Sequence, residues 1–138
     1  MPPSLTQKKL LLRTPPEISG LRTLHYLCSM RKATINFTVT LDENNLPESI
    51  EWKASDSGEG GKCKAIMLAM WNETEQNTMR IDLWTKHMLI DEMKRFFHQN
   101  LVTMSDTFQK ATNEEKMAGD MRDFCEYFAE KMELVDPK

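Results

Sequence analysis

The sequence predicts an α+β fold in which a four-stranded antiparallel meander sheet carries two C-terminal helices packed on one face, forming a two-layer sandwich. Between residues 34 and 86, polar and apolar residues alternate in short segments that turn sequences separate. After residue 86 the apolar residues recur at steps of three and four, which is the helical period. The length of 138 residues and the hydrophobic content of 40% fit one domain with its own core.

The first two predicted strands form a β-hairpin over residues 35–54. In TINFTVTL the odd-numbered residues from Ile35 to Leu41 are apolar and the even-numbered residues are polar, which indicates a strand with one buried face. DENNLP has the Asp, Asn and Pro residues that are typical of turns. ESIEWKA then returns with Ile50 and Trp52 on one side.

The next two predicted strands follow a flexible loop, SDSGEGGK. CKAIMLAMW, residues 63–71, is apolar at odd and even positions alike, which indicates a central strand covered on both faces. TMRIDLWT is the fourth strand, and we expect its Met79, Ile81 and Leu83 to face the helices. Because the connections are short, a meander is favoured.

Two amphipathic helices complete the predicted domain. The apolar stripe over residues 90–111 predicts the first helix. TNEE at residues 112–115 has the form of a capping box, so the second helix is expected to begin there.

The fourth strand also supplies a candidate partner-binding site. Arg80, Asp82, Trp84 and Lys86 occupy every second position of NTMRIDLWTKHM, so this row faces outward if the intervening apolar residues face the helices. Trp and Arg are enriched at the centres of interfaces. The alternative is that Arg80 and Asp82 form solvated cross-strand ion pairs and that Trp84 rests on a neighbour.

Composition argues against several classes of partner and location. The net charge of −3 does not favour nucleic acid, because neutralising phosphates needs a basic surface. No segment approaches the roughly 18 apolar residues of a membrane-spanning helix, so no direct membrane insertion is expected. The odd number of cysteines, Cys28, Cys63 and Cys125, argues against a disulfide framework and fits a reducing compartment.

Signals of catalysis are weak. His25, His87 and His98 do not have the spacing of metal ligands. GEGGK lacks the pattern of a phosphate-binding loop, and Cys63 and Cys125 fall within apolar patterns that predict core positions. We therefore expect no catalytic residues, no metal, no cofactor and no enzyme activity.

Residues 1–29 differ in character from the rest of the chain. They carry Lys8, Lys9, Arg13 and Arg22 against the single acidic residue Glu17. They also show no sustained period, so we expect a disordered or non-native N-terminal extension, followed by a single α+β domain over residues 30–138. Met30 precedes the first strand, and we interpret it as the true start of the protein.

Three segments carry a resemblance to a known family. INFTVTLDENNLPESIEW, then NTMRIDLWTKHM followed by DEMKRFF, resembles the gliding motility-associated GldC family of Bacteroidota over residues 30–132. Members of that family begin near the position of Met30. They commonly have a proline near the start of the first helix, where this chain has Leu89 and Ile90. The resemblance implies a small cytoplasmic protein that assists gliding, a process that uses envelope machinery coupled to a type 9 secretion system. It implies no enzyme activity or cofactor.

These observations favour a non-enzymatic accessory protein that binds a component of the motility and secretion envelope machinery through the outer sheet face. The alternative is a small-molecule carrier or sensor with a pocket between sheet and helices. An enzyme is a third reading. A homodimer that buries the apolar half of the central strand also stays open.

Overall fold

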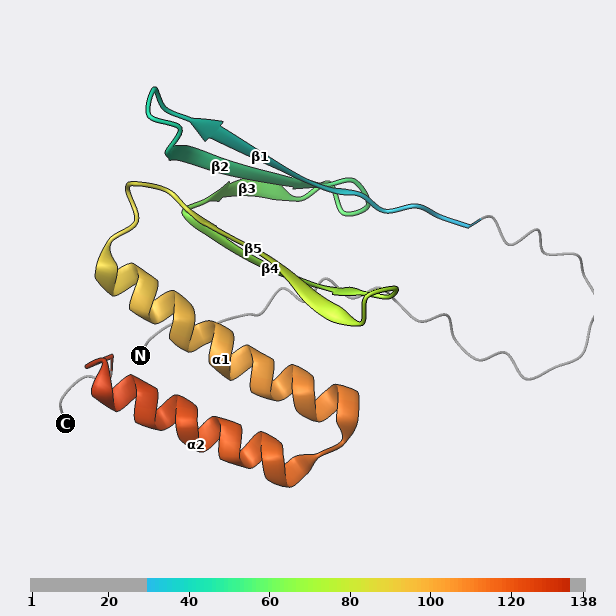
Figure 1. Ribbon diagram of the computed structural model, residues 1–138, viewed down its shortest axis with the longest axis vertical. Coiled ribbons are helices and arrows are strands. Elements are labelled where there is room, and N and C mark those ends of the chain that lie inside the picture. The colour runs from blue at the N-terminus through green and yellow to red at the C-terminus, as the bar shows by residue number, and fades with distance from the viewer. Residues whose placement is uncertain (1–29, 135–138) are drawn as a thin grey trace, which may run out of the picture. The chain divides into compact units, whose positions relative to one another are not determined.

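The structure is a computed structural model that describes residues 30–134. The predictions made for residues 1–29 lie outside the described residues. Residues from Ala33 onward form one compact unit. Its elements are β1 (Ile35–Leu41), β2 (Pro47–Ala54), β3 (Gly60–Cys63), β4 (Ala65–Asn72), β5 (Asn77–Trp84), α1 (Ile90–Thr112) and α2 (Glu115–Lys131) (Figure 1).

The predicted hairpin over residues 35–54 is confirmed. β1 and β2 pair antiparallel, with Val39 opposite Ile50. The side chain of Asp42 organises the turn by accepting the backbone N–H groups of Asn44 at 2.8 Å and Leu46 at 3.0 Å. This is the turn chemistry that an aspartate at the start of such a segment provides.

The prediction of one four-stranded sheet is wrong. The strands form a three-stranded sheet in the order β1-β2-β3 and a two-stranded sheet of β4 and β5. The segment predicted to be one central strand is interrupted at Lys64, so that its first part pairs with β2 and its second part pairs with β5. The chain bends at Lys64, so β3 before the bend and β4 after it pair with different strands.

The prediction of a flexible loop up to Lys62 is also wrong, because β3 starts at Gly60. Gly60 lies opposite Lys53, and a Cβ atom at Gly60 would lie only 2.6 Å from the carbonyl oxygen of Trp52. A glycine is therefore needed for β3 to approach β2. The same glycines are typical of loops, which is why the sequence pattern is misleading here.

Two backbone hydrogen bonds close the corner between the sheets. Thr85, which follows β5, donates its N–H to the carbonyl of Lys64 at 2.8 Å. Lys86 donates its N–H to the carbonyl of Pro47, the first residue of β2, at 3.0 Å. The end of β5 is therefore fixed to both the bend and the hairpin.

The first predicted helix is confirmed, and its start is tied to the bend. The Glu92 carboxylate in the first turn of α1 accepts the backbone N–H of Leu89 at 2.9 Å. The same carboxylate binds Lys64 Nζ at 2.7 Å. Both contacts lower the pKa of Glu92, with the backbone hydrogen bond as the larger cause.

The capping box predicted at residues 112–115 is wrong. Thr112 is the last residue of α1, and its hydroxyl donates to the carbonyl of Phe108 at 2.8 Å. Asn113 then ends the helix in the left-handed region, with φ of 60°. α2 begins at Glu115, with Glu114 as the N-cap residue.

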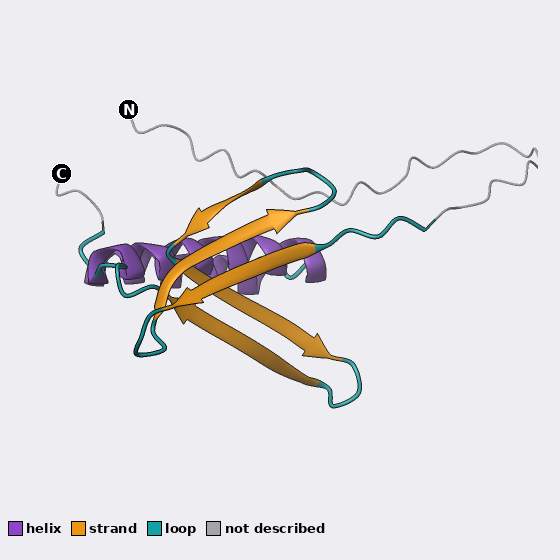
Figure 2. Ribbon diagram, turned by 90° about the horizontal axis from the view of Figure 1, so that it is seen from above, coloured by secondary structure: helices purple, strands orange, loops and turns teal. Residues whose placement is uncertain are grey.

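The two helices do not both lie on the sheet. α1 lies next to the strands, and α2 lies on the far side of α1 (Figure 1). α1 lies between the β4–β5 hairpin and α2 in Figure 1, and in Figure 2, seen from above, the strands lie in front of the helices. The residues that the two helices bury completely or nearly so are small, namely Ser105, Ala118, Cys125 and Ala129. Two longer side chains also bridge the helices: Arg122 binds Asp106, and His98 stacks on Phe128. Large stripe residues such as Met104, Met117 and Phe124 stay about half exposed.

The most deeply buried strand residues lie on β2. Ile50 and Ala54 are completely buried, and Ile66 of β4 is nearly so. Among the described residues, no helix is both long and apolar enough to cross a membrane.

Candidate functional site

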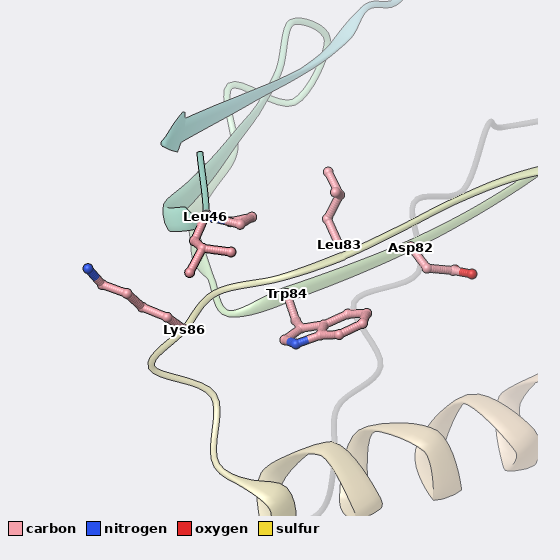
Figure 3. A pocket seen from close by; sticks show the side chains of 6 residues that line it. Leu46, Asp82, Leu83, Trp84 and Lys86 are labelled. Atoms are coloured by element: carbon pink, nitrogen blue, oxygen red, sulfur yellow. The ribbon is translucent and has the colours of Figure 1, made fainter. Parts of the chain in front are cut away.

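The orientation of β5 is the reverse of the prediction. In Figure 3, Leu83 points toward Leu46 and the three-stranded sheet, whereas Trp84 lies on the side of α1. Because the chain bends at Lys64, the β1-β2-β3 sheet lies on the side of β5 that carries Leu83. The prediction had placed the helices on that side. The row that begins at Arg80 therefore does not lie on an outer sheet face.

Three of the four predicted site residues come together on the α1 side. Arg80 Nη2 lies 3.0 Å from Asp82 Oδ1, and Arg80 Nε lies 3.3 Å from Asp82 Oδ2. This two-pronged pair on one strand is exposed to solvent, and the Asp82 carboxylate raises the pKa of Arg80. Trp84 is 55% exposed, an unusual exposure for the largest apolar side chain.

A hollow of about 420 Å³ lies between β5 and α1. It is lined by Met67, Arg80, Asp82, Trp84, Met88, Leu89, Ile90, Met93 and Phe97. The lining is apolar except for the Arg80–Asp82 pair, which lies on one wall. An apolar group with a polar or charged end therefore suits this hollow.

A second hollow of about 330 Å³ lies on the other side of the end of β5 (Figure 3). It is lined by Leu46, Pro47, Asp82, Leu83, Trp84 and Lys86. Asp82 and Trp84 line both hollows. The Trp84 ring thus stands between two concave apolar surfaces.

Lys86, the fourth predicted residue, belongs to a different cluster. Its ammonium group binds the carboxylates of Glu48 and Asp42, the latter at 3.2 Å. His87 Nε2 lies 2.8 Å from Glu48 Oε1. Lys86 therefore holds the β1–β2 hairpin to the end of β5.

The pKa values in this cluster shift for different reasons. The pKa of Glu48 is lowered mainly by its hydrogen bond with Lys86 and next by that with His87. The pKa of Asp42 is lowered mainly by the backbone N–H groups of Leu46 and Asn44, with Lys86 a smaller cause.

This difference gives a testable pH dependence. Both carboxylates have folded pKa values below their ordinary 3.8 for Asp42 and 4.5 for Glu48, so their stabilising contribution is present above those values. It is lost as the pH falls through the folded pKa values. In an NMR titration we expect Lys86→Met to return the Glu48 pKa toward 4.5 while the Asp42 pKa stays low. Equal changes at both carboxylates would refute this assignment.

The sequence-based reasoning missed the contribution of α1 to the site. Leu89 and Ile90 are 64% and 77% exposed at the start of the helix, beside Trp84. The adjacent apolar residues Leu89 and Ile90 at the start of the helix were the available signal in the sequence. Phe97, which belongs to the apolar stripe predicted over residues 90–111, also lines the hollow and is 43% exposed.

The other residues considered for catalysis or metal binding are Cys63, Cys125 and His98. Burial raises the pKa of both the Cys63 and Cys125 thiols, which disfavours the reactive thiolate. His98 stacks on Phe128, with ring centroids 6.2 Å apart. Within residues 30–134, no group of three or more His, Cys, Asp or Glu side chains could hold a metal ion.

Comparison with families of known proteins gives a match over most of the described domain. A family model described as "Gliding motility-associated protein GldC-like" matches residues 47–134, from the start of β2 past the end of α2. The match covers more than half of the chain and includes every lining residue of the two hollows around Trp84 except Leu46. Comparison with curated proteins and with solved structures gave no match.

Proposed function

Because the chain belongs to the GldC-like family of gliding motility-associated proteins, we propose that it is a non-enzymatic accessory protein of gliding motility. In this proposal it acts in the cytoplasm and binds a protein component of the motility and secretion machinery of the cell envelope. The binding site is the Trp84 surface, which we define as Arg80, Asp82, Trp84, Leu89 and Ile90.

The observation that supports this site most strongly is the exposure of Trp84 between two concave apolar surfaces. Hot spots of protein interfaces are rich in Trp and Arg and lie where apolar groups become fully desolvated. Leu89 and Ile90 extend the apolar area, and the Arg80–Asp82 pair offers both a donor and an acceptor to a partner. A partner with an apolar anchor and an adjacent polar group fits this surface.

Exchanging the two charges tests the role of the ion pair. The double variant Arg80→Asp with Asp82→Arg keeps an ion pair on β5 but reverses the order of donor and acceptor. We expect capture of the envelope component to fall several-fold in affinity purification, because a partner matched to the original order meets like charges.

The matched control exchanges another exposed pair. Lys62 Nζ and Glu51 Oε1 lie 3.8 Å apart on the three-stranded sheet, away from the Trp84 surface. Lys62→Glu with Glu51→Lys is expected to leave capture unchanged. Equal loss in both double variants would show that the Arg80–Asp82 order has no specific role.

A carrier or sensor is the second candidate function, and the hollow between β5 and α1 favours it. Its volume of about 420 Å³ lies within the range of small-molecule sites, about 300–1,000 Å³. Met67, Met88 and Met93 supply an adaptable lining.

Native mass spectrometry tests this second candidate. We expect a co-purified small molecule on the unmodified chain and its loss in Met93→Trp, which fills the hollow. Met104→Trp, on the same helix but outside that lining, should keep the ligand. A ligand-free mass for the unmodified chain would rule the carrier reading out.

A further inference from the structure

β1 is an edge strand of the three-stranded sheet. It pairs with β2 along Ile35–Leu41, and among the described residues no strand pairs with its other side. The backbone N–H and C=O groups on that side are a template for another strand. β1 is also exposed along nearly its whole length.

The side chains of β1 do not protect this edge. The sequence INFTVTL contains no charged residue and no proline, two of the means by which proteins block strand addition, and its pairing with β2 is regular except for a shift between Thr40 and Leu41. β5, in the two-stranded sheet, carries Arg80 and Asp82. β4, the other strand of that sheet, is also free of charged residues and proline, but its first four residues are buried or half-buried, whereas β1 is exposed along nearly its whole length. The β1 edge is therefore better suited than β4 or β5 to pairing with a further strand.

The partner that fits this edge is a second copy of β1. Ile35, Phe37 and Leu41 are 45%, 41% and 51% exposed on one face, so an identical strand beside β1 would continue that apolar face. The other face presents Thr and Asn side chains, and threonines that lie opposite each other across two strands form favourable pairs.

Charge order along the sequence favours the antiparallel direction. Arg31 and Lys32 precede β1, and Asp42 and Glu43 follow it. In an antiparallel pair of identical strands, the start of each strand lies beside the end of the other. The basic end of each copy would therefore lie near the partner's Glu43, whereas Asp42 is already bound to Lys86 and to the turn amides.

We propose that β1 is a self-association edge, through which two copies pair β1 with β1 antiparallel about a twofold axis at Thr38. Thr38 is the middle residue of Ile35–Leu41, so this register overlaps the strand along its full length. The two three-stranded sheets become one continuous sheet. A single strand pair is a small interface, so the dimer dissociates on dilution through the micromolar range. The Trp84 surface lies on other elements, and the proposal does not depend on it.

Sedimentation equilibrium of the full chain tests the dimer. We expect a mass rising toward twice 16.1 kDa with concentration. Thr38→Lys places two like charges opposite each other and should raise the dissociation constant by about fivefold or more. Thr78→Lys, at an exposed position of β5, should leave the constant unchanged. A chain that stays monomeric at all concentrations overturns the proposal, as does equal weakening by both variants.

A disulfide test places the axis and does not rely on weakening the strand. Paired residues across a strand pair have Cα atoms about 4.5–5.5 Å apart, within the range that a disulfide spans. Thr38→Cys should therefore give a covalent dimer on mild oxidation, in excess of the unmodified chain. Thr78→Cys should give no such excess. A Thr38→Cys chain that cross-links no better than Thr78→Cys overturns the proposal even if a dimer forms, because another surface would then be responsible.

Discussion

Replacing Trp84 with alanine is expected to weaken capture of the envelope component by about thirtyfold, which corresponds to a hot-spot loss of about 2 kcal/mol. The substitution removes the aromatic side chain that lines both hollows and is 55% exposed in the unbound chain. A partner that covers the indole buries it on both faces, so the apolar contact is lost on both sides at once.

The fold should survive this change. More than half of the Trp84 side chain is already in contact with solvent, so its removal opens no closed cavity. The backbone hydrogen bonds that fix the end of β5 come from Thr85 and Lys86 and are unaffected. Circular dichroism and thermal unfolding of the variant should therefore resemble those of the unmodified chain.

Trp71→Ala is the matched control. Trp71 lies on the neighbouring strand β4, is 68% exposed and lines neither hollow around Trp84. Quantitative affinity purification should show strong loss for Trp84→Ala and little change for Trp71→Ala. Unchanged capture in Trp84→Ala would mean that the partner binds elsewhere on the protein.

Ile50→Ala is expected to lower the free energy of unfolding by about 2–5 kcal/mol, the usual cost of truncating a fully buried aliphatic side chain. Ile50 is completely buried on β2, with Val39 of β1 opposite it on one side and Cys63 of β3 on the other. The substitution leaves a cavity at the centre of the three-stranded sheet, and the paired backbones limit how far it can collapse.

Ile35→Ala supplies the comparison on the same sheet. Ile35 has the same side chain as Ile50 but is 45% exposed. Its truncation therefore removes only about half as much buried apolar area. Urea unfolding should give a loss of about 1 kcal/mol or less for this variant. Similar losses for the two variants would contradict the burial pattern of this sheet.

The local elements of the fold were predictable because their causes are local. The alternation in TINFTVTL, the turn residues around Asp42 and the helical period after residue 90 each depend on neighbouring residues. The split of the sheet was not predictable in this way. It depends on which strand pairs with each side of the bend at Lys64, and the hydrogen bond from Thr85 to Lys64 that fixes this bend joins residues far apart in the sequence.

The same bend explains why the candidate site faces α1 and does not lie on an outer sheet face. Strand periodicity correctly grouped Arg80, Asp82 and Trp84 on one side of β5 but could not tell which layer lies on that side. Lys86 continued the period in the sequence, yet it follows the end of β5 and binds the hairpin instead. The contribution of Leu89 and Ile90 required knowing that α1 starts beside Trp84.

The central claim is that a motility component binds at the Trp84 surface, and photo-crosslinking in living cells tests it most directly. A photoreactive amino acid at Ile90, which is 77% exposed beside Trp84, would be compared with the same group at Tyr127, which is 54% exposed on α2. We expect Ile90 to cross-link to an envelope component of the gliding machinery and Tyr127 not to do so. Cross-linking of that component from Tyr127 alone, or equally from both positions, would contradict the claim.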